Sequence, residues 1–256
     1  MINLHKQNYY GETKEFMVRK KKLRFIGDSR INARMRAIDS KFMSLYRNLP
    51  FTYFWLYRRA FGNLLSGSKT VTMLDLGCGD GTATNRLNLP SGFEITGVDI
   101  FKKYLEIAKT LRIYQKLNHS DIKKYNPRSK FDVVVASHVL EHLNKKDGLK
   151  FIRKLENIAQ NRVIIATPIG QFPQEDIDKN KYQIHKSTWD VEEMKNLGYK
   201  VYAQGFRSLW GESNVIKEYG VLSYFFFLLS YLLSPLLVLR PEWGTYMICV
   251  KCLETN

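Results

Sequence analysis

Hydrophobic positions follow two alternating patterns along this chain. Short runs rich in Val, Ile and Leu, bounded by Gly or polar residues, are typical of buried strands. Between them, apolar residues recur every three or four positions, as on one face of a helix. This alternation predicts a parallel sheet with crossover helices. The predicted strands cover 71–76, 94–98, 131–136, 162–166, 199–203 and 246–250, with one more ending near His119.

Helices are predicted between these strands. One carries Phe101, Leu105, Ala108 and Leu111 on one side, and another carries Leu149, Ile152, Leu155 and Ile158. A third begins at a cap formed by Ser187 or Thr188, and Gly198 is well suited to end it.

The chain divides into three predicted parts. Residues 1–28 form a polar, basic N-terminal arm, and residues 29–69 a helical region, with apolar positions at 31, 35, 38, 42 and 45 and an aromatic-rich stretch after Pro50. These helices cover the site, face a membrane or simply pack on the core. Residues 70–256 form the main domain, with an apolar insert at 215–240.

Charge and cysteine content narrow the setting. The net charge of +16 and pI near 9.7 favour an acidic partner, such as nucleic acid, an anionic membrane surface or a phosphorylated substrate, although a solvated lysine-rich surface gives the same balance. Cys78, Cys249 and Cys252 make no disulfide framework, and we expect a cytoplasmic protein without a signal peptide. Since Cys249 and Cys252 lack a second ligand pair, we expect two packed strand residues rather than a zinc site.

A glycine-rich turn follows the first predicted strand. Gly77, Gly79 and Gly81 come directly after it, and Asp75 precedes them. Glycine allows a sharp turn into the next helix and lets a ligand approach the main chain closely. The spacing G-x-G-x-G differs from the G-x-G-x-x-G of dinucleotide folds, which disfavours a nicotinamide dehydrogenase.

Two carboxylates follow the next two strands. Asp99 closes the second strand, where it can accept hydrogen bonds from a ribose diol. Asp121 lies where the third strand should end, and there it can accept a hydrogen bond from the amine of adenine. Either residue alone is also a common strand-end cap or turn residue, but their joint order after the glycine turn favours a nucleoside site.

These segments resemble the class I S-adenosylmethionine-dependent methyltransferases, and in particular the type 11 group that includes ubiquinone-biosynthesis enzymes. The resemblance rests on LDLGCGDG (74–81), ITGVDI (95–100), FDVVVASHVLEHL (131–143) and VIIATP (163–168). It implies a Rossmann-like α/β fold, with a seven-stranded, mostly parallel sheet, helices on both faces and S-adenosylmethionine as cofactor. By this resemblance the cofactor-binding residues are Asp75, Gly77, Cys78, Gly79, Gly81, Asp99, Ile100, Asp121, Ile122, Ser137 and His138.

Histidines are the candidates for a general base. A base is needed only when the acceptor must lose a proton. His185 is the preferred candidate, with His138 and His142 as alternatives, although a loop histidine often only orders its neighbours. His138, Glu141 and His142 lie within one helical turn, but we expect capping or packing there and no metal.

The acceptor is predicted from two further features. The chain has Ser137-His-Val-Leu140 where base-amine methyltransferases carry an Asn/Asp-Pro-Pro-aromatic tetrad, which disfavours an exocyclic amine. Residues 221–239 contain no charge and reach the length of a membrane span, yet lie between two strands of one sheet. They form an interfacial helix, a re-entrant hairpin, a lid over the pocket, or a packing surface.

Together these features predict a methyltransferase acting on a hydroxyl or carboxyl of a hydrophobic or lipid-like small molecule. It would be cytoplasmic and peripheral at the inner face of an anionic membrane. The alternative is an RNA methyltransferase not of the exocyclic-amine type, favoured by the charge of +16. A third class is a protein that binds the cofactor without catalysis.

Overall fold

The fold is built on a seven-stranded sheet of order β3-β2-β1-β4-β5-β7-β6. The computed structural model describes residues 49–65, 69–171, 180–210 and 222–253. The predicted basic arm and the predicted helix near residues 31–45 lie outside the described residues. The strands are β1 Val71–Leu76, β2 Phe93–Asp99, β3 Lys116–His119, β4 Phe131–Ser137, β5 Ala159–Pro168, β6 Lys200–Phe206 and β7 Gly244–Cys252.

β7 runs antiparallel to its neighbours β5 and β6, and the other pairs are parallel. The predicted Rossmann-like, mostly parallel sheet is therefore confirmed. The helices and 3₁₀ turns are α3 Tyr53–Phe61, η1 Gly62–Leu65, α4 Thr82–Asn85, α5 Lys102–Thr110, η2 Leu140–His142, α6 Lys145–Ile158, η3 Lys181–Gln183, α7 Val191–Asn196, α8 Arg207–Trp210, α9 Leu222–Leu233, η5 Ser234–Val238 and η6 Pro241–Trp243.

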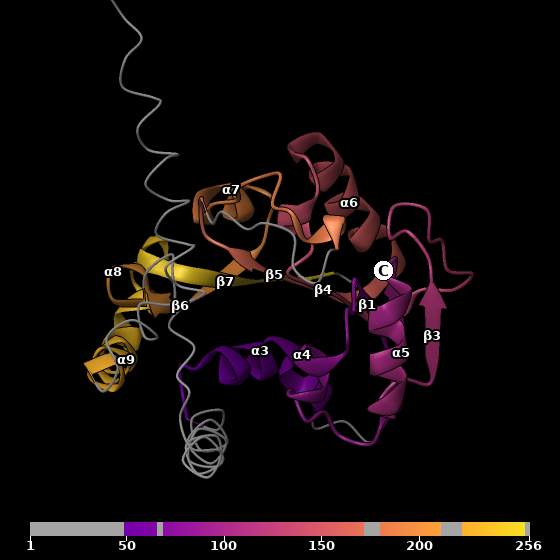
Figure 1. The fold of residues 1–256 in the computed structure, drawn as a ribbon, viewed down its shortest axis with the longest axis horizontal. Coiled ribbons are helices and arrows are strands. Elements are labelled where there is room, and N and C mark those ends of the chain that lie inside the picture. Colours follow the sequence, from indigo (N-terminus) through magenta and orange to yellow (C-terminus); the bar gives the residue numbers. More distant parts are fainter. Residues whose placement is uncertain (1–48, 66–68, 172–179, 211–221, 254–256) are drawn as a thin grey trace, which may run out of the picture. The chain divides into compact units, whose positions relative to one another are not determined.

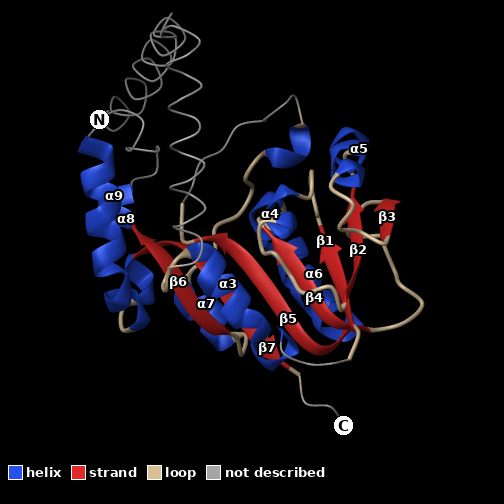
Figure 2. Ribbon diagram, turned by 90° about the horizontal axis from the view of Figure 1, so that it is seen from below, coloured by secondary structure: helices blue, strands red, loops and turns tan. Residues whose placement is uncertain are grey.

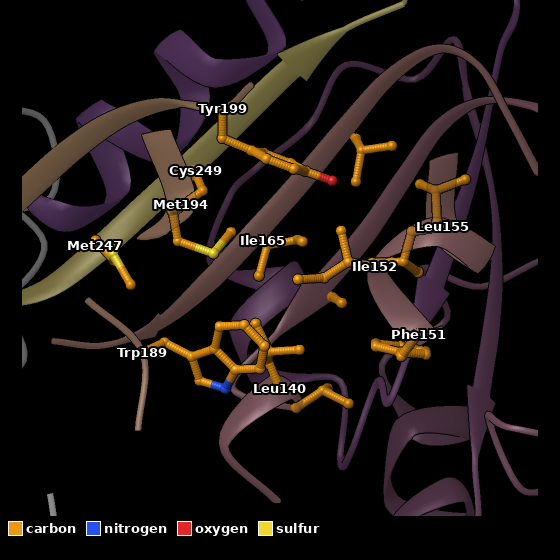
Figure 3. Packing of buried hydrophobic residues seen from close by; sticks show 14 of the residues in the cluster. Leu140, Phe151, Ile152, Leu155, Ile165, Trp189, Met194, Tyr199, Met247 and Cys249 are labelled. Carbon is orange, nitrogen blue, oxygen red and sulfur yellow. The ribbon is translucent and has the colours of Figure 1, made fainter. Parts of the chain in front are cut away.

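Helices cover both faces of the sheet. Figure 1 shows α6 and α7 on one face and α3 and α4 on the other. Alternate residues of the central strands serve the two faces, because successive strand side chains point to opposite sides. Thus Val134 and Ile165 belong to the cluster under α6, while Val133 and Ile164 belong to the cluster over α3. Figure 3 shows side chains of the first cluster, with Trp189 beside Leu140 at one edge of the group.

Helix α3 is capped at its N-terminal end and bonded to the sheet at its C-terminal end. Its cap, Thr52, accepts a hydrogen bond from the Trp55 amide at 3.3 Å. At the other end, the guanidinium of Arg162 on β5 donates to the Ala60 carbonyl at 2.9 Å and also to the Phe61 carbonyl. These bonds satisfy carbonyls that the helix leaves unpaired. They hold Tyr53, the first residue of α3, in a fixed position relative to the sheet.

The predicted start of the helix before Gly198 is wrong. Asp190 caps α7, its Oδ1 accepting from the Glu193 amide at 2.8 Å. Ser187 instead accepts a hydrogen bond from the indole N–H of Trp189 at 2.9 Å, so its hydroxyl serves the core. Gly198 has φ +86° just after the helix, as its predicted C-terminal position requires.

The two tail cysteines differ. Cys249 is buried in the sheet and burial raises its thiol pKa, as expected of a packed strand residue. Cys252 is exposed, so the prediction that both cysteines pack in the core is wrong for this one. It is the last residue of β7, at the end of the strand.

The described part of the apolar insert forms α9 and η5, between β6 and β7. Both lie beside β6 at the outer end of the sheet (Figure 2). None of the described helices is long and apolar enough to span a membrane. Several large apolar side chains of this region and of η6 are exposed: Phe225, Leu228, Leu232, Leu236, Val238, Leu239 and Trp243.

Candidate functional site

A cleft of about 190 Å³ opens at the carboxyl ends of the parallel strands. The order β3-β2-β1-β4-β5 reverses direction between β1 and β4, which is where open α/β sheets bind ligands. One side of the cleft, called the floor below, is formed by residues at or just after the ends of four adjacent strands, β1 to β4. They are Gly77, Gly79, Asp99, Ile100, Asp121, Ile122, Lys123, His138, Val139, His142 and Leu143.

Glycine is required at two points of the turn after β1. Gly77 has φ +81°, and a Cβ added there would lie 2.4 Å from Cγ2 of Val139. Gly79 has φ +56°, and a Cβ there would meet no atom within 4 Å. Since Gly79 lines the cleft, this open space is available to a ligand against bare main chain.

Asp99 ties the end of β2 to the glycine turn. Its Oδ2 accepts from the Gly79 amide at 2.9 Å, and its Oδ1 from the Phe101 amide at 2.7 Å. Each carboxylate oxygen has a second lone pair, so the group retains capacity for a diol. The pKa of Asp99 is raised above its ordinary value, because the effect of partial burial exceeds the opposite effect of the amide hydrogen bonds.

The loop after β3 supplies the next part of the floor. Oδ1 of Asp121 accepts from the Lys123 amide at 2.9 Å, which forms a tight local turn. Nζ of Lys154, on α6, donates to the carbonyls of Ile122 and Lys123 at 2.9 and 3.0 Å. The loop is therefore held by a distant helix.

Four predicted cofactor residues are not among those that line the cleft: Asp75, Cys78, Gly81 and Ser137. The first three lie behind the turn. Oδ2 of the buried Asp75 accepts from Thr84 at 2.6 Å and from the Tyr114 hydroxyl at 2.9 Å. Burial raises the pKa of Asp75 to about 6, although these hydrogen bonds oppose the shift. Asp75 therefore stabilises the glycine turn through these hydrogen bonds and does not contact the cleft.

The other two have similar settings. Cys78 is buried, and burial raises its thiol pKa. Gly81 has φ +76° at the start of α4, and a Cβ there would lie 2.8 Å from the Tyr114 ring. Both residues shape the turn from its inner side.

His138 lies at the centre of a hydrogen-bonded network. Its Nδ1 is 3.2 Å from Oε1 of Glu141, and its Nε2 is 3.4 Å from the Tyr53 hydroxyl. The same hydroxyl is 3.3 Å from Oγ of Ser137, and Oε2 of Glu141 accepts from Thr167 at 3.0 Å. Sequence reasoning missed Tyr53 and Thr167 because β4, α3 and β5 are far apart in the chain.

Glu141 is a buried carboxylate within this network. Burial alone would raise its pKa, but the hydrogen bond from His138 and the charges of His138 and His142 lower the pKa below its ordinary value. The group therefore favours its ionised form. A buried carboxylate paired with a cleft histidine is an arrangement that supports proton transfer.

The other two candidate histidines differ from His138. His142 lines the cleft, and its Nδ1 donates to the Ile184 carbonyl at 3.3 Å. Burial lowers the pKa of His142. His185 is not among the residues that line the cleft, and its ring stacks edge-on against His142 at 4.9 Å between centroids.

Glu141, His142 and His185 bring ligand-type atoms within 4.8 Å of one another. Both oxygens of Glu141 already accept hydrogen bonds, from His138 and from Thr167. We therefore assign no metal to this group, and the expected absence of a metal stays a prediction.

The far wall of the cleft comes from the segment between β5 and α7, in which His185 was the only site residue predicted from the sequence. The wall consists of Asn180, Tyr182, Gln183 and Lys186. The Lys186 amide donates to the Glu141 carbonyl at 2.7 Å, which attaches the wall to the floor. This segment has no periodic pattern, so the sequence offered no signal beyond its length.

The geometry fits a nucleoside cofactor. The open face of Gly79 gives a ligand access to main chain, and Asp99 supplies a carboxylate beside it. Fold and cleft together define a class I methyltransferase architecture. The chain matches a family model described as "Methyltransferase domain" over residues 74–161, which spans the turn, both acidic strand ends and His138.

Curated relatives agree with this class. The chain is similar to a ubiquinone biosynthesis O-methyltransferase of Pelagibacter ubique (strain HTCC1062), with 28% identity over 52% of this chain and 63% of the relative. It is also similar to a malonyl-[acyl-carrier protein] O-methyltransferase of Bacillus anthracis, with 23% identity over 54% of this chain and 52% of the relative. The matches thus span less than two thirds of either relative's length.

Among solved structures, the small RNA methyltransferase HEN1 shares the fold. The TM-score is 0.51 at 17% identity, over 78% of this chain and 25% of that one. Residues 74–161 thus match a methyltransferase domain, and the sheet has the fold of the class I S-adenosylmethionine-dependent methyltransferases, as the resemblance predicted. S-Adenosylmethionine is the cofactor of this class.

Proposed function

We propose that the protein transfers a methyl group from S-adenosylmethionine to an oxygen of a hydrophobic, membrane-presented small molecule. The observation that carries this proposal is the cleft in which Gly79 exposes main chain beside Asp99, and which His138 also lines. The cofactor, when bound, supplies an activated methyl group on a sulfonium. The chain has to hold it, align the acceptor and exclude water.

The cleft residues divide along the cofactor. Gly77 and Gly79 would contact the methionyl part of the cofactor, and Asp99 with Ile100 would bind the ribose. Asp121 and Ile122 would contact the adenine, in a loop that Lys154 stabilises. Ser137 and His138 would border the end that faces the acceptor. Asp75, Cys78 and Gly81 would act from behind the turn.

An oxygen acceptor is favoured by two lines of argument. Both curated relatives are named O-methyltransferases. The chain also lacks the Asn/Asp-Pro-Pro-aromatic tetrad of base-amine methyltransferases after β4. A hydroxyl or a carboxyl acceptor remains compatible with both.

The hydrophobic acceptor is favoured by the exposed surface of α9 and η5. Phe225, Leu228 and Leu232 recur at helical spacing and are 59%, 53% and 63% exposed. Leu239 and Trp243 are further exposed apolar residues of the following segment, in which Arg240 pairs with Glu242 at 3.5 Å. Large exposed apolar surfaces mark interaction sites, such as contacts with a bilayer. No cleft residue comes from α9 or η5, so the described insert does not act as a lid over the pocket.

The acceptor class is tested with S-adenosylmethionine labelled in its methyl group. The protein is incubated with fractionated lipid, RNA and small-molecule extracts, and each fraction is counted. We expect label in the lipid or apolar small-molecule fractions. Label found only in RNA would overturn the proposed acceptor.

Vesicle flotation tests the membrane contact. The full chain is floated with phosphatidylcholine vesicles containing phosphatidylglycerol, and compared with a Phe225→Ser/Leu232→Ser variant. The matched control, Ile107→Ser/Leu149→Ser, removes two exposed apolar residues elsewhere. Flotation should be lost in the first variant and kept in the second; equal behaviour of the two would refute the assignment of this surface.

An RNA acceptor is the second candidate, and charge is the observation that favours it. Residues 1–48 contain twelve basic and four acidic residues, so this stretch holds half of the net charge of +16. A steep fall of RNA affinity with salt, equivalent to several phosphate contacts, would support this alternative.

A further inference from the structure

The tautomer of His138 follows from its partners. Nδ1 is 3.2 Å from Oε1 of Glu141, and an ionised carboxylate can only accept a hydrogen bond. Nδ1 therefore carries the hydrogen, and Nε2 of the neutral ring carries a lone pair. Glu141 is buried, so water does not compete for this carboxylate.

The Nε2 side of the ring faces a weaker partner. The Tyr53 hydroxyl lies 3.4 Å away, near the limit of a hydrogen bond. The His138 side chain is 40% exposed and lines the cleft. An acceptor hydroxyl entering the cleft can therefore replace Tyr53 at Nε2.

His138 is also held by its main chain. Its φ is +54°, a left-handed conformation that is costly for most residues but less so for His, Asn and Asp. Its amide donates to the Ala166 carbonyl at 2.8 Å, which ties it to β5. Backbone conformations of this kind occur where surrounding structure fixes a functional side chain.

We propose that Nε2 of His138 removes the proton from a hydroxyl acceptor, and that Glu141 is the positioning residue that orients the ring and stabilises its cation. This inference rests on the proposed function and deepens it, because it selects a hydroxyl rather than a carboxyl. A carboxyl is already ionised near neutral pH and requires no base.

The proposed step is balanced in atoms and charge. The acceptor's O–H bond breaks as its proton moves to Nε2, and an electron pair of the oxygen forms the new bond to the methyl carbon. The electron pair of the former methyl–sulfur bond remains on sulfur. His138 becomes an imidazolium, whose charge the ionised Glu141 stabilises, and the proton later passes to water.

Several titratable groups face this pair. Tyr53 on α3 and Tyr246 on β7 adjoin the His138 ring, and burial raises the pKa of both. Both phenols therefore stay neutral near pH 7. His142 interacts electrostatically with Glu141, and burial lowers the pKa of His142.

The first test compares two histidine variants that carry the same replacement. His138→Asn keeps a residue type that tolerates positive φ but removes the basic nitrogen. His185→Asn makes the same change at the competing candidate. Full-length variants receive methyl-labelled cofactor and a fractionated lipid extract, and S-adenosylhomocysteine affinity is measured in parallel. We expect His138→Asn to slow transfer by about 100-fold or more, with a much smaller loss for His185→Asn.

The chemistry of the labelled product separates hydroxyl from carboxyl. Mild alkali releases a methyl ester as volatile methanol, whereas an ether keeps its label. Base-stable label is expected. Base-labile label, or near-normal transfer by His138→Asn, would overturn this inference while leaving the methyltransferase proposal intact. If the wild-type protein binds S-adenosylhomocysteine but labels no fraction, the proposed function fails, and this inference fails with it.

The pH profile tests the role of Glu141. Loss of its negative charge in Glu141→Gln destabilises the imidazolium, so the acid limb of the rate profile should move to lower pH while the plateau falls about 10-fold. Glu141→Asp should partly restore both. A loss of rate that is equal at every pH would show a merely structural role for Glu141 and refute its assignment.

Discussion

Two regions enclose the cleft, and they are built differently. The floor follows the ends of β1 to β4, and main-chain amides fix its polar groups, as with both oxygens of Asp99. The far wall, from Asn180 to Lys186, is an irregular segment whose Tyr182 and Lys186 side chains are exposed. It is attached through main chain, by the Lys186 amide on the Glu141 carbonyl.

This difference indicates that the floor residues are constrained by the fold, whereas the wall residues are free to vary with the acceptor. The floor tolerates few substitutions, because its residues also end a strand or begin a helix. Side chains of the wall can be replaced without disturbing those main-chain bonds. We therefore expect substitutions in the floor to affect folding and cofactor affinity, and substitutions in the wall to affect the acceptor.

The largest effect is expected from Gly77→Ala. The new Cβ would overlap Val139 at 2.4 Å and hold a positive φ, so stability should fall by about 3 kcal/mol and S-adenosylhomocysteine affinity should be largely lost. Gly79→Ala is the matched control. It meets no protein atom within 4 Å, so it should cost about 1 kcal/mol for its φ yet still weaken binding. Equal stability losses in urea unfolding would contradict this description of the turn.

Asp99→Ala should have the next largest effect. Removing hydrogen bonds from a charged acceptor costs about 1.5–3 kcal/mol, which corresponds to roughly 10- to 150-fold in affinity. The domain should remain folded, since β2 is paired on both sides. Calorimetric titration with S-adenosylhomocysteine measures the affinity, and an unchanged dissociation constant would remove Asp99 from the proposed ribose site.

Asp75, which lies beneath the floor, should make the free energy of unfolding depend on pH. Its pKa of about 6 lies above the ordinary value of 3.8, so between these values the folded state binds the additional proton. Stability from this group is therefore present below pH 4 and lost as pH rises through 6, by about 3 kcal/mol in total, of which about 2 kcal/mol is lost between pH 4.5 and 7. Asp75→Asn should remove that part of the pH dependence. Urea unfolding at pH 4.5 and 7 measures it, and parallel behaviour of wild type and variant would contradict the assignment.

Local geometry explains how far the sequence alone could predict this molecule. The strands 71–76 and 131–136 and the turn between Gly77 and Gly81 were predicted closely, because adjacent residues determine them. The start of α7 was mistaken because three residues near it can all cap a helix, and the Ser187 hydroxyl was needed by Trp189.

The network around His138 could not be predicted in the same way. Tyr53 lies 85 residues before His138, and Thr167 lies 26 residues after Glu141. Only the order of the strands and the placement of α3 bring these side chains together. The preference for His185 over His138 followed from its place in a loop, whereas a place on the cleft and a buried carboxylate partner, which favour His138, are properties of the fold.

The smallest effects are expected in the wall. Tyr182→Ala and Lys186→Ala remove exposed side chains but keep the main-chain bond to Glu141, so S-adenosylhomocysteine affinity should change less than about 5-fold. Asn180→Ala is the contrasting variant, because its buried side chain accepts from the Tyr182 amide at 3.1 Å and supports the wall itself. If Tyr182→Ala weakened binding as much as Asp99→Ala, the wall would be part of the cofactor site, and the separation of floor and wall by function would be wrong.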